Sequence, residues 1–127
     1  MAIFTPISSE LSIQQSTCEM VDLAWSGDHL EAVFKTGDEF ICVTFEQIVT
    51  ARISDESVFS AEAEPRTGLR AEGFAYSVEG GTMLTSLPAA ARQAFRNIRQ
   101  YAFVSSSACL DVPSTEPPSF EQLEPQG

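Results

Sequence analysis

The sequence predicts an α+β domain, with a bent or barrel-like antiparallel sheet of about six or seven strands and one amphipathic helix over residues 88–100. The first observation behind this fold class is a hairpin signal, in which two apolar-rich runs over 30–35 and 40–45 are joined by a short turn containing Gly37. The second is a series of shorter apolar runs bounded by polar or glycine-containing turns. The third is a stretch of helix-forming residues that follows Pro88.

Consecutive antiparallel strands are predicted in the first half of the chain. Residues 20–25 alternate well enough for a first strand, and Ser26-Gly27-Asp28 is typical of a turn. Residues 30–35 alternate as a second strand, whereas 40–45 is typical of a strand buried on both faces. After a polar interruption the apolar pattern resumes over 48–53 with changed phase, which indicates a bulge or a turn where the sheet bends.

The second half of the chain combines the helix with further strands. Residues 57–68 are predicted as an irregular connection and 73–78 as a strand. Ser86 and Pro88 are typical of a helix start, because a hydroxyl can cap the first turn and proline is tolerated there. Short strands over 101–104 and 109–112 would close the sheet. The apolar residues at helical spacing predict that the helix packs on the sheet: Ala91, Ala94, Phe95, Ile98 and Tyr101.

A single folded domain is predicted over residues 18–112, and a chain of this size buries enough surface to fold without disulfides or metal. Residues 1–17 fit a short edge strand or a loosely docked N-terminal arm equally well. After Val112 the composition changes, because four of the seven prolines follow it and no lysine or arginine does. Residues 113–127 are therefore predicted as a proline- and glutamate-rich tail that the fold does not need.

The chain is strongly acidic, with 18 aspartates and glutamates against 7 lysines and arginines and a formal net charge of −11. Such a surface repels a phosphate backbone, so we expect no nucleic acid partner. It favours a basic protein partner, although the same charge also serves solubility. The three cysteines form no Cys-x-x-Cys pair, and no apolar stretch has the length of a membrane span. We therefore expect a reduced, soluble, cytoplasmic protein that is not inserted in a membrane.

The candidate binding residues are three arginines and one tryptophan. Arg92, Arg96 and Arg99 are separated by four and three residues, so on a continuous helix they form one stripe. Such a stripe is suited to an acidic group of a protein partner or to a carboxylate ligand, because arginine binds carboxylates through two parallel hydrogen bonds. The alternative is a solvated face that pairs with the chain's own carboxylates. Trp25 also has two interpretations, an interface residue or a core residue.

The sequence contains no recognisable catalytic or metal-binding pattern. His29 is the single histidine, and its spacing from Cys18, Cys42 and Cys109 matches no zinc pattern. A relay of Cys109, His29 and Asp111 would form only if the fold brought the three together. We therefore assign no catalytic residue, no metal site and no cofactor, and we expect a protein that is not an enzyme.

Three short segments resemble a set of small uncharacterised bacterial β-rich proteins. They are a charged strand end, an aromatic strand and a closing strand pair. In this chain these segments are Arg52-Ile53-Ser54-Asp55-Glu56, then Phe74-Ala75-Tyr76-Ser77-Val78-Glu79, then Tyr101-Ala102-Phe103-Val104 with Cys109-Leu110-Asp111-Val112. The resemblance covers about half of the chain, and it implies a β-rich fold and no particular activity.

These features favour a non-enzymatic acidic interaction protein, such as an inhibitor or antidote that binds a basic protein partner. The first alternative is a barrel that binds a small molecule, or an enzyme that uses carboxylates. The second is a structural subunit that forms a homo-oligomer through a free strand edge. The interior of the protein is the feature that distinguishes the interaction protein from the ligand-binding alternative. A closed apolar interior favours the interaction protein, and a cavity of several hundred Å³ lined by Tyr76, Tyr101 or arginines favours the ligand-binding alternative.

Overall fold

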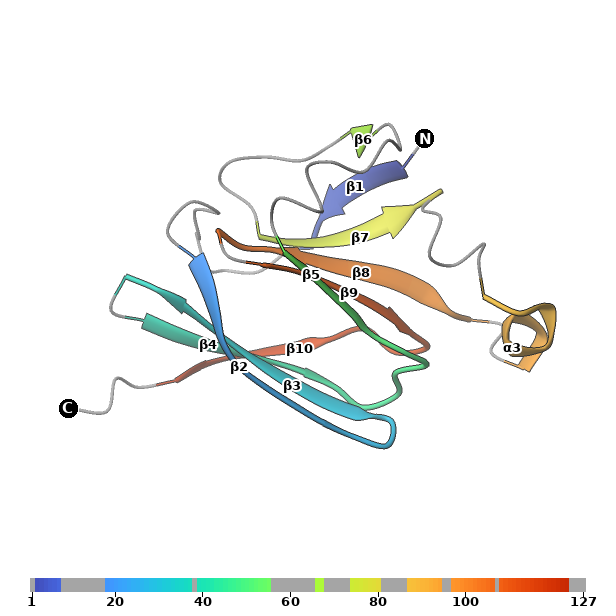
Figure 1. Cartoon of the computed structure of the whole chain (residues 1–127), viewed down its shortest axis with the longest axis horizontal. Coiled ribbons are helices and arrows are strands. Elements are labelled where there is room, and N and C mark those ends of the chain that lie inside the picture. Colours follow the sequence, from blue (N-terminus) through green and yellow to red (C-terminus); the bar gives the residue numbers. More distant parts are fainter. Residues whose placement is uncertain are drawn as a thin grey trace.

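The fold is a sandwich of two β-sheets, seen in a computed structural model that describes residues 2–7, 18–37, 39–55, 66–67, 74–80, 87–94, 97–106 and 108–123 (Figure 1). Sheet A has six strands, and every neighbouring pair is antiparallel except the last two strands, which are parallel. Across sheet A the order is β5 (Arg52–Asp55), β9 (Ala108–Ser114), β8 (Arg99–Val104), β7 (Ala75–Glu79), β1 (Ala2–Pro6) and β6 (Arg66–Thr67).

Sheet B has four antiparallel strands, β10 (Ser119–Leu123), β4 (Glu39–Phe45), β3 (His29–Thr36) and β2 (Cys18–Ser26), in that order. The turns that join β2 to β3 and β3 to β4 contain Gly27 and Gly37, each with φ of 61°. Glycine adopts this left-handed conformation without the steric penalty of a side chain, so both turns lie where the sequence predicts them. The hairpin over 30–45 is confirmed.

The core lies between the two sheets and is rich in phenylalanine. The Phe34 ring lies 5.3 Å from that of Phe74 and 5.8 Å from that of Phe103, and Phe45 lies 5.7 Å from Phe103. These rings come from both sheets and are almost completely buried. Aromatic pairs at such distances add specific geometry to the burial of apolar surface, so they fix how the sheets pack on one another.

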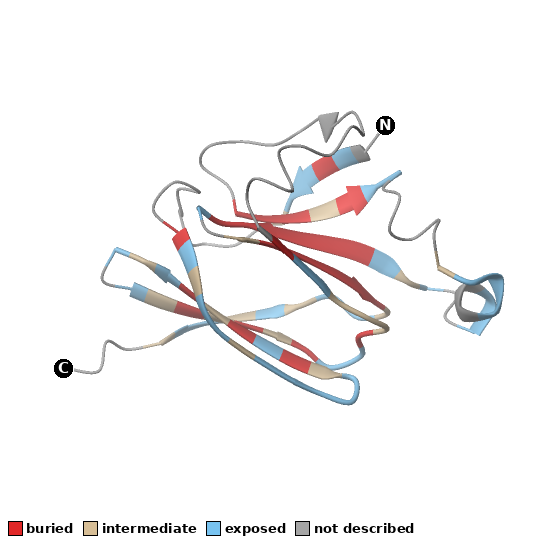
Figure 2. Ribbon diagram, viewed as in Figure 1, coloured by how far each residue is buried: buried red, intermediate tan, exposed pale blue. Residues whose placement is uncertain are grey.

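The two sheets differ in how their outer faces are covered. In sheet B the buried side chains of β3 and β4 alternate with more exposed ones, as expected for a sheet with one face on the core. In sheet A, five consecutive residues of β8, from Gln100 to Val104, are all buried (Figure 2). A second buried apolar cluster, which includes Tyr76, Val104 and Cys109, therefore lies on the face of sheet A that points away from sheet B.

The predicted α+β class with a helix over 88–100 is wrong. Helix α3 (Ala89–Ala94) has only six residues, and Figure 1 shows it beyond the end of β8, off the sandwich. Ala94, predicted to face the sheet, is exposed. From Arg99 the chain is extended instead, because β8 then pairs with both β7 and β9 and buries side chains on two faces. A helix would bury only one stripe of the same residues.

The predicted single bent or barrel-like sheet is also wrong, because the described strands form two separate open sheets. The boundary before a tail at residue 113 is wrong as well. Strand β9 continues to Ser114, and β10 pairs with β4 from Ser119 to Leu123. At the other end, β1 lies between β7 and β6, while residues 8–17 and most of the predicted connection over 57–68 are outside the described residues.

Candidate functional site

The three predicted arginines do not form one helical stripe. Arg92 belongs to α3, with its side chain outside the described part, and Arg96 is outside the described residues. Arg99 is the first residue of β8, and its backbone pairs with that of Ser114. Because α3 ends at Ala94, Arg99 occupies a strand and not the predicted helix face. Its guanidinium forms no ion pair with any described carboxylate, and its side chain lines a pocket.

Trp25 lies in the edge strand β2, opposite Leu30 of β3, and remains 51% exposed. Its indole Nε1 donates a 2.9 Å hydrogen bond to the carbonyl of Gly27 in the adjoining turn. The ring thus lies at the rim of the sandwich, so the interpretation as a core residue is wrong. The interface interpretation stays a prediction.

The residues of the conceivable relay lie in different layers. Cys109 and Asp111 lie on the outer face of sheet A, where the Cys109 Sγ is 3.9 Å from Asp111 Oδ2. His29 lies on the outer side of sheet B, because its neighbour Leu30 points into the core. The cysteines are equally dispersed, and no group of three potential metal ligands occurs among the described residues. Burial, followed by the charge of Glu19, raises the pKa of the Cys18 thiol to about 12.

Asp111 is the centre of a buried polar network on the outer face of sheet A. The residue is 2% exposed, and its carboxylate accepts hydrogen bonds from Arg52 Nη2 at 3.0 Å and from Gln100 Nε2 at 3.3 Å. A buried carboxylate requires such partners because burial removes its hydration. The network links β5, β9 and β8, which makes it a structural element of sheet A.

The largest group of exposed charges in the described part lies on the outer face of sheet B, and we call it the acidic face. The register places one continuous row across all four strands, from Glu121 through Cys42 and Val33 to Asp22. Its two ends are exposed carboxylates, and its two central side chains are half-buried. The carboxylates of the acidic face are Glu19, Asp22, Glu31, Glu46 and Glu121.

The centre of the acidic face is apolar. Phe40 lies beside Val33 and Cys42, and all three are half-buried. Lys35 extends over the Phe40 ring, with its Nζ 5.9 Å from the ring centroid. The face therefore combines an apolar centre with a rim that is mostly negative, and Lys35 is the only lysine or arginine that the described part contributes to it.

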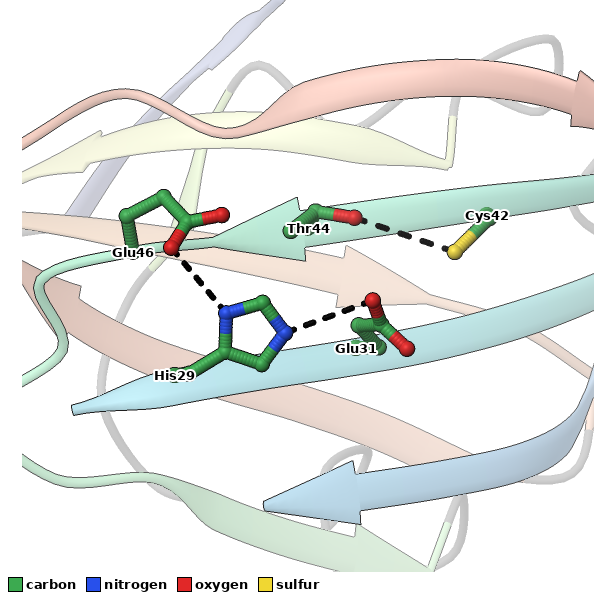
Figure 3. A network of polar contacts seen from close by, with 5 residues as sticks. All are labelled: His29, Glu31, Cys42, Thr44 and Glu46. Atoms are coloured by element: carbon green, nitrogen blue, oxygen red, sulfur yellow. Dashed lines mark hydrogen bonds and ion pairs between the residues drawn. The ribbon is translucent and has the colours of Figure 1, made fainter. Parts of the chain in front are cut away.

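His29 bridges two glutamates at one end of the acidic face, as Figure 3 shows. Its Nδ1 is 3.1 Å from Glu46 Oε2, and its Nε2 is 3.3 Å from Glu31 Oε1. The hydrogen bond to Glu46 and then that to Glu31 raise the pKa of His29 above its ordinary value of 6.5. Protonation of His29 would therefore make this end of the face less negative at mildly acidic pH.

We expect an NMR titration to give a His29 pKa above 6.5, with Glu46→Gln lowering it more than Glu31→Gln. Because the folded state favours the protonated ring, the bridge stabilises the fold fully below the unfolded pKa. That contribution is lost as pH rises through the folded pKa. Glu79→Gln, an exposed control on β7, should leave the His29 pKa unchanged. An unchanged pKa in Glu46→Gln would contradict the bridge.

The acidic face is not evident from the sequence, because the apolar composition of residues 40–45 predicts a strand buried on both faces. The alternation of Phe40, Cys42 and Thr44 with Ile41, Val43 and Phe45 was the available signal. The cysteine and the threonine at these outward positions are uncharged, so the strand resembles one that is buried on both faces. A half-exposed face also accommodates these two residue types.

Comparison of the chain with protein-family models, with curated proteins and with solved structures finds no match in any of the three. The resemblance to small uncharacterised bacterial proteins therefore stays a prediction. Within the described residues, no helix has the length and apolar character required to cross a membrane.

Proposed function

We propose that this chain is a non-enzymatic interaction protein whose acidic face binds a basic protein partner, in the manner of an inhibitor or antidote. The observation that carries the proposal is the row from Glu121 to Asp22, in which exposed carboxylates flank the half-buried Cys42 and Val33. Protein interfaces combine a desolvated centre with a polar rim, and this face has both parts.

Electrostatics supports a basic partner over an acidic one. The net charge of −11 attracts cationic surfaces at long range, and the carboxylates of the acidic face concentrate that field on one sheet. Like charges placed opposite one another in an interface are strongly unfavourable, so the same face excludes acidic partners. Charge would then determine the association rate and the choice of partner, while the apolar centre around Phe40 would contribute contact area.

Self-association through a strand edge receives less support. Strand β2 is one of the two outermost strands of sheet B, and a register shift between Met20 and Asp22 interrupts its pairing with β3. Glu19 and Asp22 are exposed on that strand. Bulges and charges on an edge strand are features that oppose pairing with another copy.

The proposal is tested with two triple variants that change the net charge equally. The first, Glu19→Gln with Asp22→Asn and Glu121→Gln, neutralises three of the five carboxylates of the acidic face. The second neutralises three exposed carboxylates elsewhere: Asp28→Asn, Glu79→Gln and Glu116→Gln. Wild-type protein captures a partner from extract of the source cells, and association rates of the purified pair are then measured for all three proteins.

We expect the partner to be basic and the association rate to fall about tenfold or more in the acidic-face variant, because steering depends on the local charge. The control variant should change the rate by less than about twofold, and added salt should weaken wild-type binding. Equal losses in the two variants would show that only net charge matters. Capture of an acidic partner would exclude the proposal outright.

The ligand-binding alternative also has a specific observation in its favour. The space between the sheets is filled by the phenylalanine core, but a pocket of about 420 Å³ lies beside Arg99 and Tyr101. Its size and lining match the criterion that the sequence suggested for a ligand-binding protein.

A further inference from the structure

The pocket lies where strands β8 and β9 meet the end of the sandwich. It has a volume of about 420 Å³, within the range of about 300–1,000 Å³ that is usual for small-molecule sites. Two segments contribute its described walls, the start of β8 and the residues that follow β9. The lining residues are Asn97, Ile98, Arg99, Tyr101, Thr115 and Pro117.

The walls of the pocket are held by the core. The Tyr101 side chain is largely buried, and its ring packs against Phe45 with 5.7 Å between centroids. On the other side, the Thr115 backbone N–H donates to the carbonyl of Gln47 at 3.1 Å. The neighbouring Ser114 hydroxyl is 2.8 Å from the Glu116 carbonyl, which further defines the path of this segment. A pocket with fixed walls binds a ligand at a low entropic cost of ordering.

The electrostatics of the pocket differ from those of the chain as a whole. No described carboxylate lines it, and Glu116, which lies between Thr115 and Pro117 in sequence, is not one of the lining residues. Among the other described cations, Arg52 is paired with Asp111 and Lys35 lies over the Phe40 ring. Arg99 has no such partner in the described part, although the chain has 18 carboxylates available. Its guanidinium is thus available to an external anion.

We propose that this pocket binds a small organic acid, with one carboxylate on the Arg99 guanidinium and an apolar body against Tyr101, Ile98 and Pro117. A planar carboxylate matches the two parallel donors of a guanidinium. A phosphate ester fits less well, because it carries nearly two charges and Arg99 is the one cation among the described lining residues of a strongly acidic protein. This ligand site is separate from the acidic face and does not depend on a protein partner.

The test is an NMR titration of the full chain with phenylacetate, with its neutral counterpart phenylacetamide, and with phenyl phosphate. We expect phenylacetate to bind with a millimolar Kd and to shift the signals of Tyr101 and Thr115. Phenylacetamide should bind about tenfold more weakly, since it lacks the charge-assisted hydrogen bonds. Phenyl phosphate should also bind more weakly than phenylacetate.

Two variants separate the pocket from general electrostatics, because each removes one positive charge. Arg99→Gln should weaken phenylacetate binding about tenfold. Lys35→Gln, on the outer face of sheet B, should leave it unchanged. Arg99→Lys retains the charge but loses the two-pronged geometry, so its Kd should lie between those of wild type and Arg99→Gln. Thermal unfolding of each variant checks that the exposed substitutions leave the fold intact.

Four results would overturn the proposal. The first is an absence of shifts at Tyr101 and Thr115 with about 10 mM phenylacetate, well above the expected Kd. The second is equal binding of phenylacetate and phenylacetamide, which would mean that the carboxylate is not recognised. The third is an equal loss of binding in Arg99→Gln and Lys35→Gln. Stronger binding of phenyl phosphate would replace the carboxylate by a phosphate as the recognised group.

Discussion

Replacing Phe45 by alanine is expected to lower the free energy of unfolding by about 4 kcal/mol, the usual cost of removing a buried aromatic side chain from a core. Phe45 is completely buried, and its ring packs 5.7 Å from those of both Tyr101 and Phe103. The substitution therefore leaves a cavity between the two sheets that rigid strands cannot close. Chemical denaturation followed by the fluorescence of Trp25 measures the loss.

Lys35→Ala is the matched control, because Lys35 lies in the adjacent strand with its side chain on the exposed face of the same sheet. We expect its effect to remain within about 0.5 kcal/mol. Similar losses of stability for the two variants would mean that the inward and outward faces of β3 and β4 are assigned incorrectly.

Ending the chain after Thr115 is expected to cost at least about 3 kcal/mol, although the proline-rich composition of this segment predicts a dispensable tail. The truncation removes β10 and with it Phe120, whose ring lies 6.3 Å from Phe74 and 6.4 Å from Phe103. It also leaves the backbone of β4 without its partner over five residue pairs. The unfolding free energy of the truncated chain, or its failure to fold, provides the measurement.

Two point variants in β10 identify the source of this loss. Phe120→Ala should account for about 2 kcal/mol, since Phe120 packs against the core but is only half-buried. Glu121→Ala, the adjacent outward position, should change stability by less than about 0.5 kcal/mol. A truncated chain as stable as the full chain would show that β10 contributes no net stability.

Local sequence signals identified the hairpins well. The alternation of Leu30, Ala32 and Phe34 with Glu31, Val33 and Lys35 indicated the inward face of β3, and Gly27 and Gly37 marked turns that require positive φ. These features depend on neighbours a few residues apart, so they can be recognised without knowledge of the fold. The strands predicted at 73–78, 101–104 and 109–112 correspond to β7, β8 and β9 for the same reason.

The helix prediction failed where local and tertiary preferences disagree. Ile98 and Tyr101 fit the helical spacing of the preceding alanines, but Tyr101 to Val104 also supply strand-forming residues. Pairing with two strands and burial on both faces of sheet A favour the strand over the helix. Neither the pairing nor the burial can be recognised from the residues of this segment alone. Arg99 is consequently a strand residue at the rim of a pocket and not part of the predicted helix stripe.

The sequence by itself determined the β-rich character, the two glycine turns and the acidic charge, because composition and short-range periodicity control them. Only the tertiary structure decided that β10 completes sheet B, that carboxylates of β2, β3 and β10 gather on one face with Glu46 after β4, and that Arg99 stands apart from those carboxylates. The physical reason is that strand pairing joins residues distant in sequence, such as Glu121 with Cys42. Its free energy depends on which partner edge is available and not on the strand alone.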